Sequence, residues 1–272
     1  VEFAYFYNTF GTKVTLVEAL PKILPSEDEE ISDLLSDIFK KKKIDIKINT
    51  CVENIEVLNT TVKVYTDNDE IIEADKALIA VGVTGNIEDL GLENIGVKVK
   101  GGSIVTDEFM QTTIKGIYAI GDVAGPPWLA HVASEEGIVA AEHIANANPE
   151  PMVYNNIPGC TYCHPEVASV GLSEKSALKA GYDIKVGKFP FRALGKAMAV
   201  SETDGFVKVI YDAKYGELLG CHIIGSEATN LITEATIARK LETTWSEVLK
   251  TIHPHPTLSE AFMEATADAF EK

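Results

Sequence analysis

The sequence has 272 residues, room for two domains or more, and its 46% hydrophobic and 24% charged residues are the balance of an ordinary soluble globular protein. Its 24 Lys and Arg stand against 41 Asp and Glu, and a net charge of −17 argues against a general nucleic-acid binder despite the local basic run 40–43. No stretch reaches the roughly 18 to 20 uninterrupted apolar residues that a membrane helix needs.

The chain opens with an α/β pattern. Residues 2–10 have a helical pattern with Gly11 as the stop, and the β-branched run 13–18 predicts a short buried strand. Because the helical pattern starts at residue 1 with neither a cap nor Met, we expect the sequence to be a piece of a longer protein.

A second helix and several strands follow. The helix is predicted over 27–43, where Ser26 and Glu29 form a capping box and acidic residues lead while lysines trail. A near-continuous apolar run at 76–81 is typical of a buried strand in a parallel sheet. Three further strands are predicted at 44–49, 52–58 and 61–66.

Glycines mark the middle of the chain. The stretch 82–86 interrupts the apolar pattern, and we predict a domain crossing there. A strand over 117–120 leads into a Gly-Asp pair, a helix is predicted over 128–147, and 148–151 is typical of a linker.

The last part, from about residue 157, differs in character. Two short strands and a helix over 174–180 come first, and three helical segments end the chain. Between them, strands are predicted at 183–189, 206–211 and 217–224. The sequence therefore predicts an α/β lobe followed by an α+β domain with an antiparallel sheet.

Glu18 lies where the first predicted strand ends. In a dinucleotide-binding unit, an acidic residue about 20 residues past the glycine-rich turn accepts hydrogen bonds from the adenosine ribose and repels the extra phosphate of NADP. Glu18 has that place if a glycine turn ended just before Val1. The spacing alone also allows a surface glutamate at a strand end.

Asp122 follows a predicted buried strand, at the sheet edge where α/β folds bind ligands. Its carboxylate could hold a sugar-like polyol through paired hydrogen bonds. Pro126-Pro127 would start a helix whose free backbone donors suit a phosphate or an electron-rich ring edge. An Asx turn between strand and helix explains the same residues without a ligand.

The sharpest cluster is 253–260, with the sequence His-Pro-His-Pro-Thr-Leu-Ser-Glu. Two prolines stiffen the backbone around His255 and favour a cis His-Pro bond. A rigid imidazole followed by the carboxylate of Glu260 is typical of a general acid/base with its orienting partner. Thr257 and Glu260 also form a helix capping box, and His255 could be a hydrogen-bonded loop histidine, so the structural and catalytic interpretations both stand.

Cys160, Cys163 and His164 match the spacing of covalent haem attachment, of a redox pair and of half a zinc site. No second cysteine pair supports zinc, since Cys51 and Cys221 stand apart, and the segment lies in a β-like stretch. We therefore predict ordinary thiols and no metal site. Four cysteines also do not make a disulfide scaffold, which indicates a reducing compartment.

In this order, the motifs resemble the flavin-dependent pyridine nucleotide–disulfide oxidoreductases, and within them the branch that oxidises dihydrolipoamide. The similarity runs from Val1 to about Phe270, and the motifs are highly specific together although no single one is. They are Val1-Glu2-Phe3 with 11–18 (Gly-Thr-Lys-Val-Thr-Leu-Val-Glu), 23–25 (Ile-Leu-Pro), 118–122 (Tyr-Ala-Ile-Gly-Asp), 165–171 (Pro-Glu-Val-Ala-Ser-Val-Gly) and 255–260 (His-Pro-Thr-Leu-Ser-Glu).

The resemblance implies an NAD site. Val1 and Glu2 match the end of the NAD glycine motif, with Glu2 near the nicotinamide and the flavin. Glu18 matches the ribose-binding acid, Val52 an adenine-side contact and Gly82 a contact near the nicotinamide. The stretch that begins at Gly82 lacks the Arg and Pro that many relatives carry there.

The resemblance also implies a flavin site and a catalytic pair. Asp122 matches the residue that binds FAD, His255 the catalytic acid/base, and Glu260 the acid that orients it. The helix start beside the flavin matches Trp128, Leu129, Ala130 and His131.

The implied activity is oxidation of protein-bound dihydrolipoamide to lipoamide through a redox cysteine pair and FAD, with NAD as hydride acceptor, within a 2-oxo acid dehydrogenase complex. The implied partners are a second copy in a homodimer and an acyltransferase subunit that carries the dihydrolipoamide, with no nucleic acid and no membrane. The implied location is the bacterial cytoplasm or the mitochondrial matrix. The expected domains are a truncated NAD-binding domain at 1–83, a central segment that contacts FAD at 84–150, and a dimerisation domain at 151–272.

One departure from the family pattern is large. The part that would hold the main FAD lobe, the redox cysteine pair and the NAD glycine turn is absent, and Cys160 and Cys163 have the wrong domain and spacing to replace that pair. The expected fold is therefore α/β NAD/FAD-binding lobe remnants followed by an α+β dimerisation domain. We expect the chain alone to be inactive, and whether it retains FAD or NAD stays open. The alternatives are a non-enzymatic fragment with an NAD lobe and a dimerisation domain, or a related disulfide reductase such as glutathione or mercuric reductase.

Overall fold

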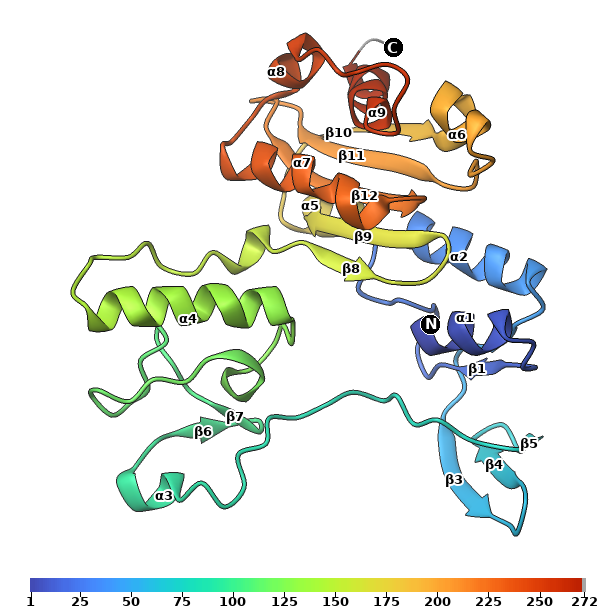
Figure 1. Ribbon diagram of the computed structural model, residues 1–272, viewed down its shortest axis with the longest axis vertical. Coiled ribbons are helices and arrows are strands. Elements are labelled where there is room, and N and C mark those ends of the chain that lie inside the picture. The colour runs from blue at the N-terminus through green and yellow to red at the C-terminus, as the bar shows by residue number, and fades with distance from the viewer. Residues whose placement is uncertain (271–272) are drawn as a thin grey trace. The chain divides into compact units, whose positions relative to one another are not determined.

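The computed structural model describes residues 1–270, which form two compact units (Figure 1). One unit combines residues 1–77 with the chain from residue 155 onward, and the other is residues 78–154. The domain boundaries expected at residues 83 and 150 stay predictions. None of the helices in residues 1–270 has the length and apolar character that a membrane crossing requires.

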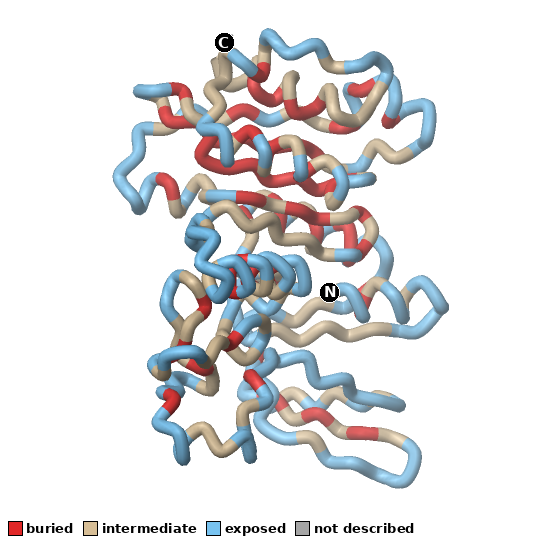
Figure 2. Tube along the Cα trace, turned by 60° about the vertical axis from the view of Figure 1, so that its left-hand side comes forward, coloured by how far each residue is buried: buried red, intermediate tan, exposed pale blue. Residues whose placement is uncertain are grey.

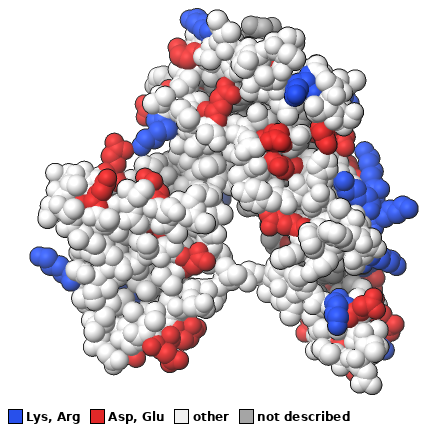
Figure 3. Space-filling model, viewed as in Figure 1, with Lys and Arg blue, Asp and Glu red and all other residues white. Residues whose placement is uncertain are grey.

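The first unit opens with two helices and two parallel strands, as the sequence predicts. These elements are α1 (Glu2–Thr9), β1 (Thr15–Val17), α2 (Glu29–Lys41) and β2 (Asp45–Lys47). Strand β1 pairs with β2 in a register that places Thr15 opposite Asp45. The last turn of α2 carries Lys40 and Lys41, which suit the negative end of the helix dipole, and Figure 3 shows basic side chains gathered at this end of the helix.

Helix α2 has a different cap from the one predicted. Its N-cap is Asp28, whose side chain accepts the backbone N–H of Glu30 at 3.1 Å. The predicted capping box of Ser26 and Glu29 is therefore wrong, because the buried carboxylate of Asp28 already satisfies a free backbone donor of the first turn.

Three antiparallel strands follow in the order β3-β4-β5. They are β3 (Val52–Val57), β4 (Val62–Thr66) and β5 (Ile71–Ala74), of which the last was not predicted. The buried strand predicted at 76–81 is wrong: this run forms no strand, and Val81 is 91% exposed. A central strand of a parallel sheet needs a neighbour on each side, and the only parallel sheet within residues 1–270 consists of β1 and β2.

The second unit is rich in loops and contains one long helix. Its elements are α3 (Leu92–Ile95), β6 (Val99–Lys100), β7 (Ser103–Ile104), the short 3-10 helix η1 (Gly121–Ala124) and α4 (Ala130–Ile144). The strand predicted over 117–120 is wrong, because only an isolated bridge between Tyr118 and Gln111 forms there. Helix α4 confirms the predicted long helix, but it begins three residues after Pro127, so the prolines do not occupy its first position.

The rest of the first unit is built on a five-stranded antiparallel sheet in the order β10-β11-β12-β9-β8, which confirms the predicted sheet (Figure 1). The strands are β8 (Gly159–Thr161), β9 (Glu166–Gly171), β10 (Ile184–Pro190), β11 (Phe206–Asp212) and β12 (Leu218–Gly225). The helices are α5 (Glu174–Lys179), α6 (Gly195–Ala199), α7 (Ala228–Lys240), α8 (Trp245–Lys250) and α9 (Glu260–Phe270), with short 3-10 turns η2 (Tyr154–Asn156) and η3 (Phe191–Ala193).

Strand β11 is buried on both faces. Val207, Val209 and Tyr211 pack into the main core beneath α7 and α9. Lys208 alternates to the opposite face, where it meets Asp28 at the start of α2. Figure 2 shows buried chain concentrated in this sheet, so the sheet is a firm support for the helices and loops attached to it.

Candidate active site

The structure brings His255 and Glu260 together. The Nδ1 atom of His255 lies 2.8 Å from Oε1 of Glu260. The histidine side chain is 76% exposed, whereas that of Glu260 is 15% exposed. The carboxylate is therefore shielded, and the imidazole that it holds is open to an incoming group.

The loop before α9 builds this pair. The peptide bond between His255 and Pro256 is cis, as the sequence favoured. The backbone N–H of Thr257 donates to Oε2 of Glu260 at 2.8 Å, and the Thr257 hydroxyl donates to the carbonyl of Pro254 at 2.7 Å. Glu260 thus accepts one arm of the predicted capping box and also bonds His255, so the structural and orienting roles coexist in one side chain.

These bonds decide which nitrogen of His255 can act. The hydrogen bond from the Thr257 backbone, followed by that from His255, holds the pKa of Glu260 below its usual range. Because an ionised carboxylate only accepts hydrogen bonds, Nδ1 of His255 carries the proton. Nε2, which bonds no other group in the described part of the chain, is then the nitrogen that can take up a proton.

The same loop carries a second histidine–glutamate pair. Nε2 of His253 lies 2.7 Å from Oε1 of Glu234 on α7, and Nδ1 lies 3.0 Å from the carbonyl of Thr251. The His253 side chain is 4% exposed, so it anchors the loop to α7 and leaves the open chemistry to His255. Sequence reasoning missed Glu234, because nothing in a helix 19 residues upstream marks it as a partner.

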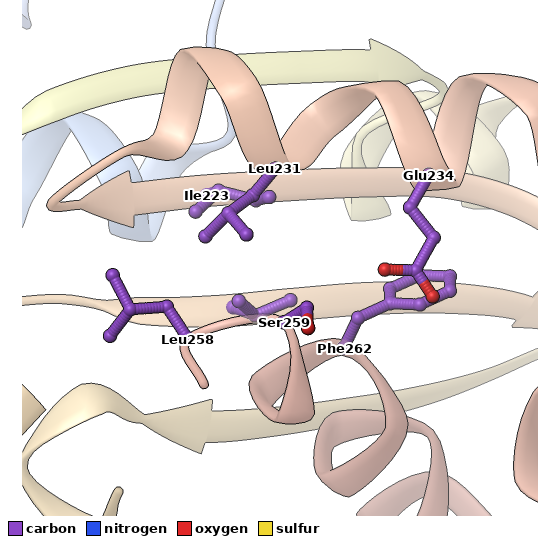
Figure 4. Close-up of a pocket in the computed structure, with 7 residues that line it drawn as sticks. Ile223, Leu231, Glu234, Leu258, Ser259 and Phe262 are labelled. Carbon is purple, nitrogen blue, oxygen red and sulfur yellow. The ribbon is translucent and has the colours of Figure 1, made fainter. Parts of the chain in front are cut away.

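A small cavity lies between this loop and α7 (Figure 4). Its volume of about 10 Å³ is about that of a single water position, so it is no substrate site. Glu234 and Ser259 supply the polar groups of its wall. Its other lining residues are apolar: Val207, Ile223, Leu231, Leu258 and Phe262.

Glu18 lies at the carboxyl end of β1, the edge at which α/β sheets bind ligands. Its backbone N–H donates to the carbonyl of Lys47 at 2.8 Å, and its Oε1 accepts the N–H of Leu20 at 2.8 Å. The second carboxylate oxygen makes no bond in residues 1–270, which leaves it able to accept from a ribose hydroxyl. Val52 begins β3 and is 44% exposed.

Three further residues of the expected NAD site lie outside β1 and β3, at helix α1 or in the second unit. Val1 is the N-cap of α1, and Glu2 is the first residue of that helix. The Oε1 atom of Glu2 accepts the backbone N–H of Tyr162 at 2.8 Å, so Glu2 joins α1 to the five-stranded sheet. Gly82 lies in the second unit with φ of +118°, a conformation that favours glycine.

The residues expected at a flavin lie in the second unit. Asp122 is exposed in η1, and its carboxylate bonds no other described group. Trp128 is 39% exposed, and Leu129 caps α4 without a side-chain hydrogen bond. A free carboxylate for ribityl hydroxyls and a helix start at Ala130 and His131 with no acid in its first turn fit the polyol and the electron-rich ring edge of FAD.

The four cysteines are free thiols. Burial raises the pKa of Cys160, of Cys221 and of Cys163, the last to about 12. Desolvation together with nearby Asp67 raises the pKa of Cys51. The described chain contains no group of three or more His, Cys, Asp or Glu side chains that could hold a metal ion.

Two family models match the chain. The model described as pyridine nucleotide-disulphide oxidoreductase matches residues 1–137, and the model of the dimerisation domain of that family matches residues 157–266. The chain belongs to the pyridine nucleotide-disulphide oxidoreductase family. The resemblance inferred from the sequence motifs is thereby confirmed, and the five-stranded sheet lies in the dimerisation domain.

Individual members of the family are also similar to this chain. It is 49% identical to a dihydrolipoyl dehydrogenase of Rhizobium etli and 46% identical to one of Zymomonas mobilis, each over 99% of its length. It spans 57% and 59%, respectively, of those two proteins.

Two solved structures share the fold. LpdA from Mycobacterium tuberculosis superposes with a TM-score of 0.92 at 26% identity, covering 97% of this chain and 58% of that one. The flavoprotein disulfide reductase RclA from Escherichia coli gives a TM-score of 0.91 at 28% identity, covering 97% of this chain and 60% of that one.

Proposed function

We propose that this chain supplies the NAD lobe, the flavin-contact segment and the dimerisation domain of a dihydrolipoyl dehydrogenase, an NAD-dependent flavoenzyme. The observation that carries the proposal is the pair of His255 and Glu260, joined at 2.8 Å within the dimerisation domain. The names of the curated relatives supply the reaction.

His255 acts in this proposal as the base for a thiol. A free thiol has a pKa near 8.5, so only about 3% is thiolate at pH 7. Nε2 of His255 is placed to take a proton from dihydrolipoamide, and the ionised carboxylate of Glu260 stabilises the imidazolium that forms. Bound FAD would supply the route by which the two electrons of the dithiol reach NAD.

The proposed assembly is a homodimer in which His255 of one chain faces the flavin of the other. The 76% exposure of the His255 side chain supports this arrangement, because its own chain does not close over the imidazole. The proposed substrate is dihydrolipoamide carried on an acyltransferase subunit of a 2-oxo acid dehydrogenase complex. The proposed location is the bacterial cytoplasm or the mitochondrial matrix.

Glu18→Gln tests the NAD site. We propose a hybrid enzyme in which the amino-terminal part of the Rhizobium etli relative precedes this chain. Loss of a charged hydrogen bond to the ribose is expected to lower kcat/KM for NAD by roughly 10-fold or more and to raise relative use of NADP.

Steady-state rates with both nucleotides measure the Glu18→Gln effect, and Asp75→Asn, an exposed acid in the same unit, is the control. Unchanged NAD kinetics in Glu18→Gln would show that Glu18 is a strand-end surface residue.

The 272-residue chain alone is expected to give no lipoamide-dependent formation of NADH. The reason is that its four cysteines are free thiols, and burial raises the pKa of Cys160, Cys163 and Cys221, which disfavours the reactive thiolate. NADH absorbance measures turnover, and the visible spectrum of the purified chain shows whether flavin is retained. Turnover at the rate of an intact relative contradicts this prediction.

A further inference from the structure

A buried carboxylate in the second unit has no part in the function proposed so far. Glu136, on α4, is 3% exposed. Its Oε2 accepts the backbone N–H of Gly121 at 2.6 Å, and its Oε1 accepts the hydroxyl of Tyr154 at 2.7 Å. The carboxylate therefore ties together a turn, a long helix and the segment that leaves the unit.

The turn that Glu136 holds is conformationally demanding. Gly121 has φ of +69°, and a Cβ atom there would lie 3.2 Å from the Cβ of Ala133 on α4. On the other side, a Cβ on Gly85 would lie 3.2 Å from the carbonyl oxygen of Asp122 and 3.1 Å from the Cα of Val123. The turn is thus packed from both sides, and the Gly121 amide within it is held by the Glu136 carboxylate.

Two donors satisfy the buried carboxylate of Glu136. A buried carboxylate is costly unless donors satisfy it, and here a backbone amide and a phenol do so. Burial, together with the hydrogen bond to Glu136, raises the pKa of Tyr154, so the phenol keeps its proton and donates a hydrogen bond to Oε1 of Glu136. The carboxylate of Glu136 is therefore held next to the Gly121 amide.

Asp122 follows Gly121 directly, and its exposed carboxylate bonds no other group in residues 1–270. We propose that Glu136, held by Tyr154, is a positioning residue that sets the turn at Gly121 and thereby aims the Asp122 carboxylate at the hydroxyls of a polyol. The identity of the polyol as the ribityl chain of FAD rests on the proposed function. The role of Glu136 in setting the turn at Gly121 does not depend on that function.

The first test measures the turn in the 272-residue chain. With ¹⁵N-labelled glycine, the amide of Gly121 reports its hydrogen bond through its exchange rate. Glu136→Gln is expected to speed that exchange at least tenfold, and Tyr154→Phe is expected to speed it less. The matched control is Glu135→Gln, the exposed neighbour on α4, which should leave the rate unchanged.

A second test measures flavin affinity in the hybrid enzyme by quenching of FAD fluorescence. Glu136→Gln is expected to weaken FAD binding about tenfold, with Glu135→Gln unchanged. Asp122→Asn sets the scale of the direct contact. Because Glu136 acts through Asp122, the double variant is expected to bind no more weakly than Asp122→Asn alone.

The outcomes separate the two proposals. If the wild-type hybrid binds no FAD, the proposed function fails, and the exchange of Gly121 still decides the role of Glu136. If FAD binds but Glu136→Gln changes neither the exchange of Gly121 nor the affinity, the positioning role is overturned. A Glu136→Gln chain with a lowered melting temperature is replaced in both tests by Tyr154→Phe, which keeps the carboxylate.

Discussion

Replacement of His255 by glutamine in the hybrid enzyme is expected to lower the oxidation of dihydrolipoamide by roughly 10²- to 10⁴-fold while FAD stays bound. Glutamine is polar and similar in length to histidine but has no nitrogen that takes up a proton. The loss therefore falls on the thiol step, which needs Nε2 of His255. Steady-state formation of NADH measures the loss, and the flavin absorbance of the purified variant measures cofactor content.

A reaction without thiols is the internal control for His255→Gln. Reduction of a dye by NADH through the flavin needs no thiol proton, so the variant is expected to keep that activity. If dye reduction and flavin content fall as far as dihydrolipoamide oxidation, His255 is a structural residue of the loop and the proposed chemistry is wrong.

The ionisation of Glu260 sets the pH range over which its carboxylate can hold His255. Its pKa in the folded chain lies below the ordinary value of 4.5, chiefly because the Thr257 backbone donates to it. A depressed carboxyl pKa stabilises the pair above the ordinary value, and that contribution is lost as the pH falls through the folded value. The orientation of His255 is therefore expected to persist across the neutral range in which the enzyme would work.

The elements that sequence predicts well are those in which the local pattern decides the structure. Strands β10, β11 and β12 consist largely of apolar residues, and helix α2 shows an apolar stripe with acids first and lysines last. Glu260 follows His255 by five residues, so one rigid loop suffices to bring the pair together.

The wrong predictions, two strands and one helix cap, share a different cause. The runs 76–81 and 117–120 have the composition of buried strands, but a strand forms only when another strand lies beside it, and composition says nothing about neighbours. The cap of α2 shows the same limit, because the capping residue Asp28 also bonds Lys208, which lies 180 residues further along the chain.

The local sequence also does not predict the residues that support the site, Glu234 and Glu136, because their partners are distant in sequence. Glu234 meets His253 from a separate helix, and Glu136 meets Tyr154 across 18 residues of chain that include a linker. A lone glutamate in an amphipathic helix is indistinguishable in sequence from a solvated one. Only the fold shows which of the adjacent acids 135 and 136 is buried.

Replacement of Lys208 by methionine is expected to lower the free energy of unfolding of the first unit by about 3 to 5 kcal/mol. The Nζ atom of Lys208 lies 2.9 Å from Asp28, 2.8 Å from Glu30 and 2.7 Å from Glu174. The side chains of Lys208 and Asp28 are only 2% and 3% exposed. Methionine fills the same space but leaves Asp28 as a buried anion without its cation. Unfolding in urea measures the change.

The loss caused by Lys208→Met is expected to depend on pH. In the wild-type chain, burial opposes ionisation of Asp28, but the hydrogen bond and charge of Lys208 outweigh it and hold the pKa below its usual range. Without Lys208, burial is opposed only by smaller effects, such as the hydrogen bond from the Glu30 backbone N–H, and that pKa rises. The carboxyl then takes up a proton as the solution is acidified, so the difference between variant and wild type is largest near neutral pH and shrinks in acid.

Lys175→Met is the matched control. Lys175 on α5 pairs at 2.8 Å with Glu29 of α2, the helix that Lys208 also binds, but the Lys175 side chain is 79% exposed. An exposed pair contributes less than about 1 kcal/mol, so this variant is expected to unfold close to wild type. Adding Asp28→Asn to Lys208→Met removes the stranded charge and keeps a side chain that can cap α2, so part of the loss should return. Equal stabilities for Lys208→Met and Lys175→Met would mean that the buried cluster does not hold α2 to the sheet, and the attachment would then rest on the apolar contacts of α2 with Phe206 and Ile224.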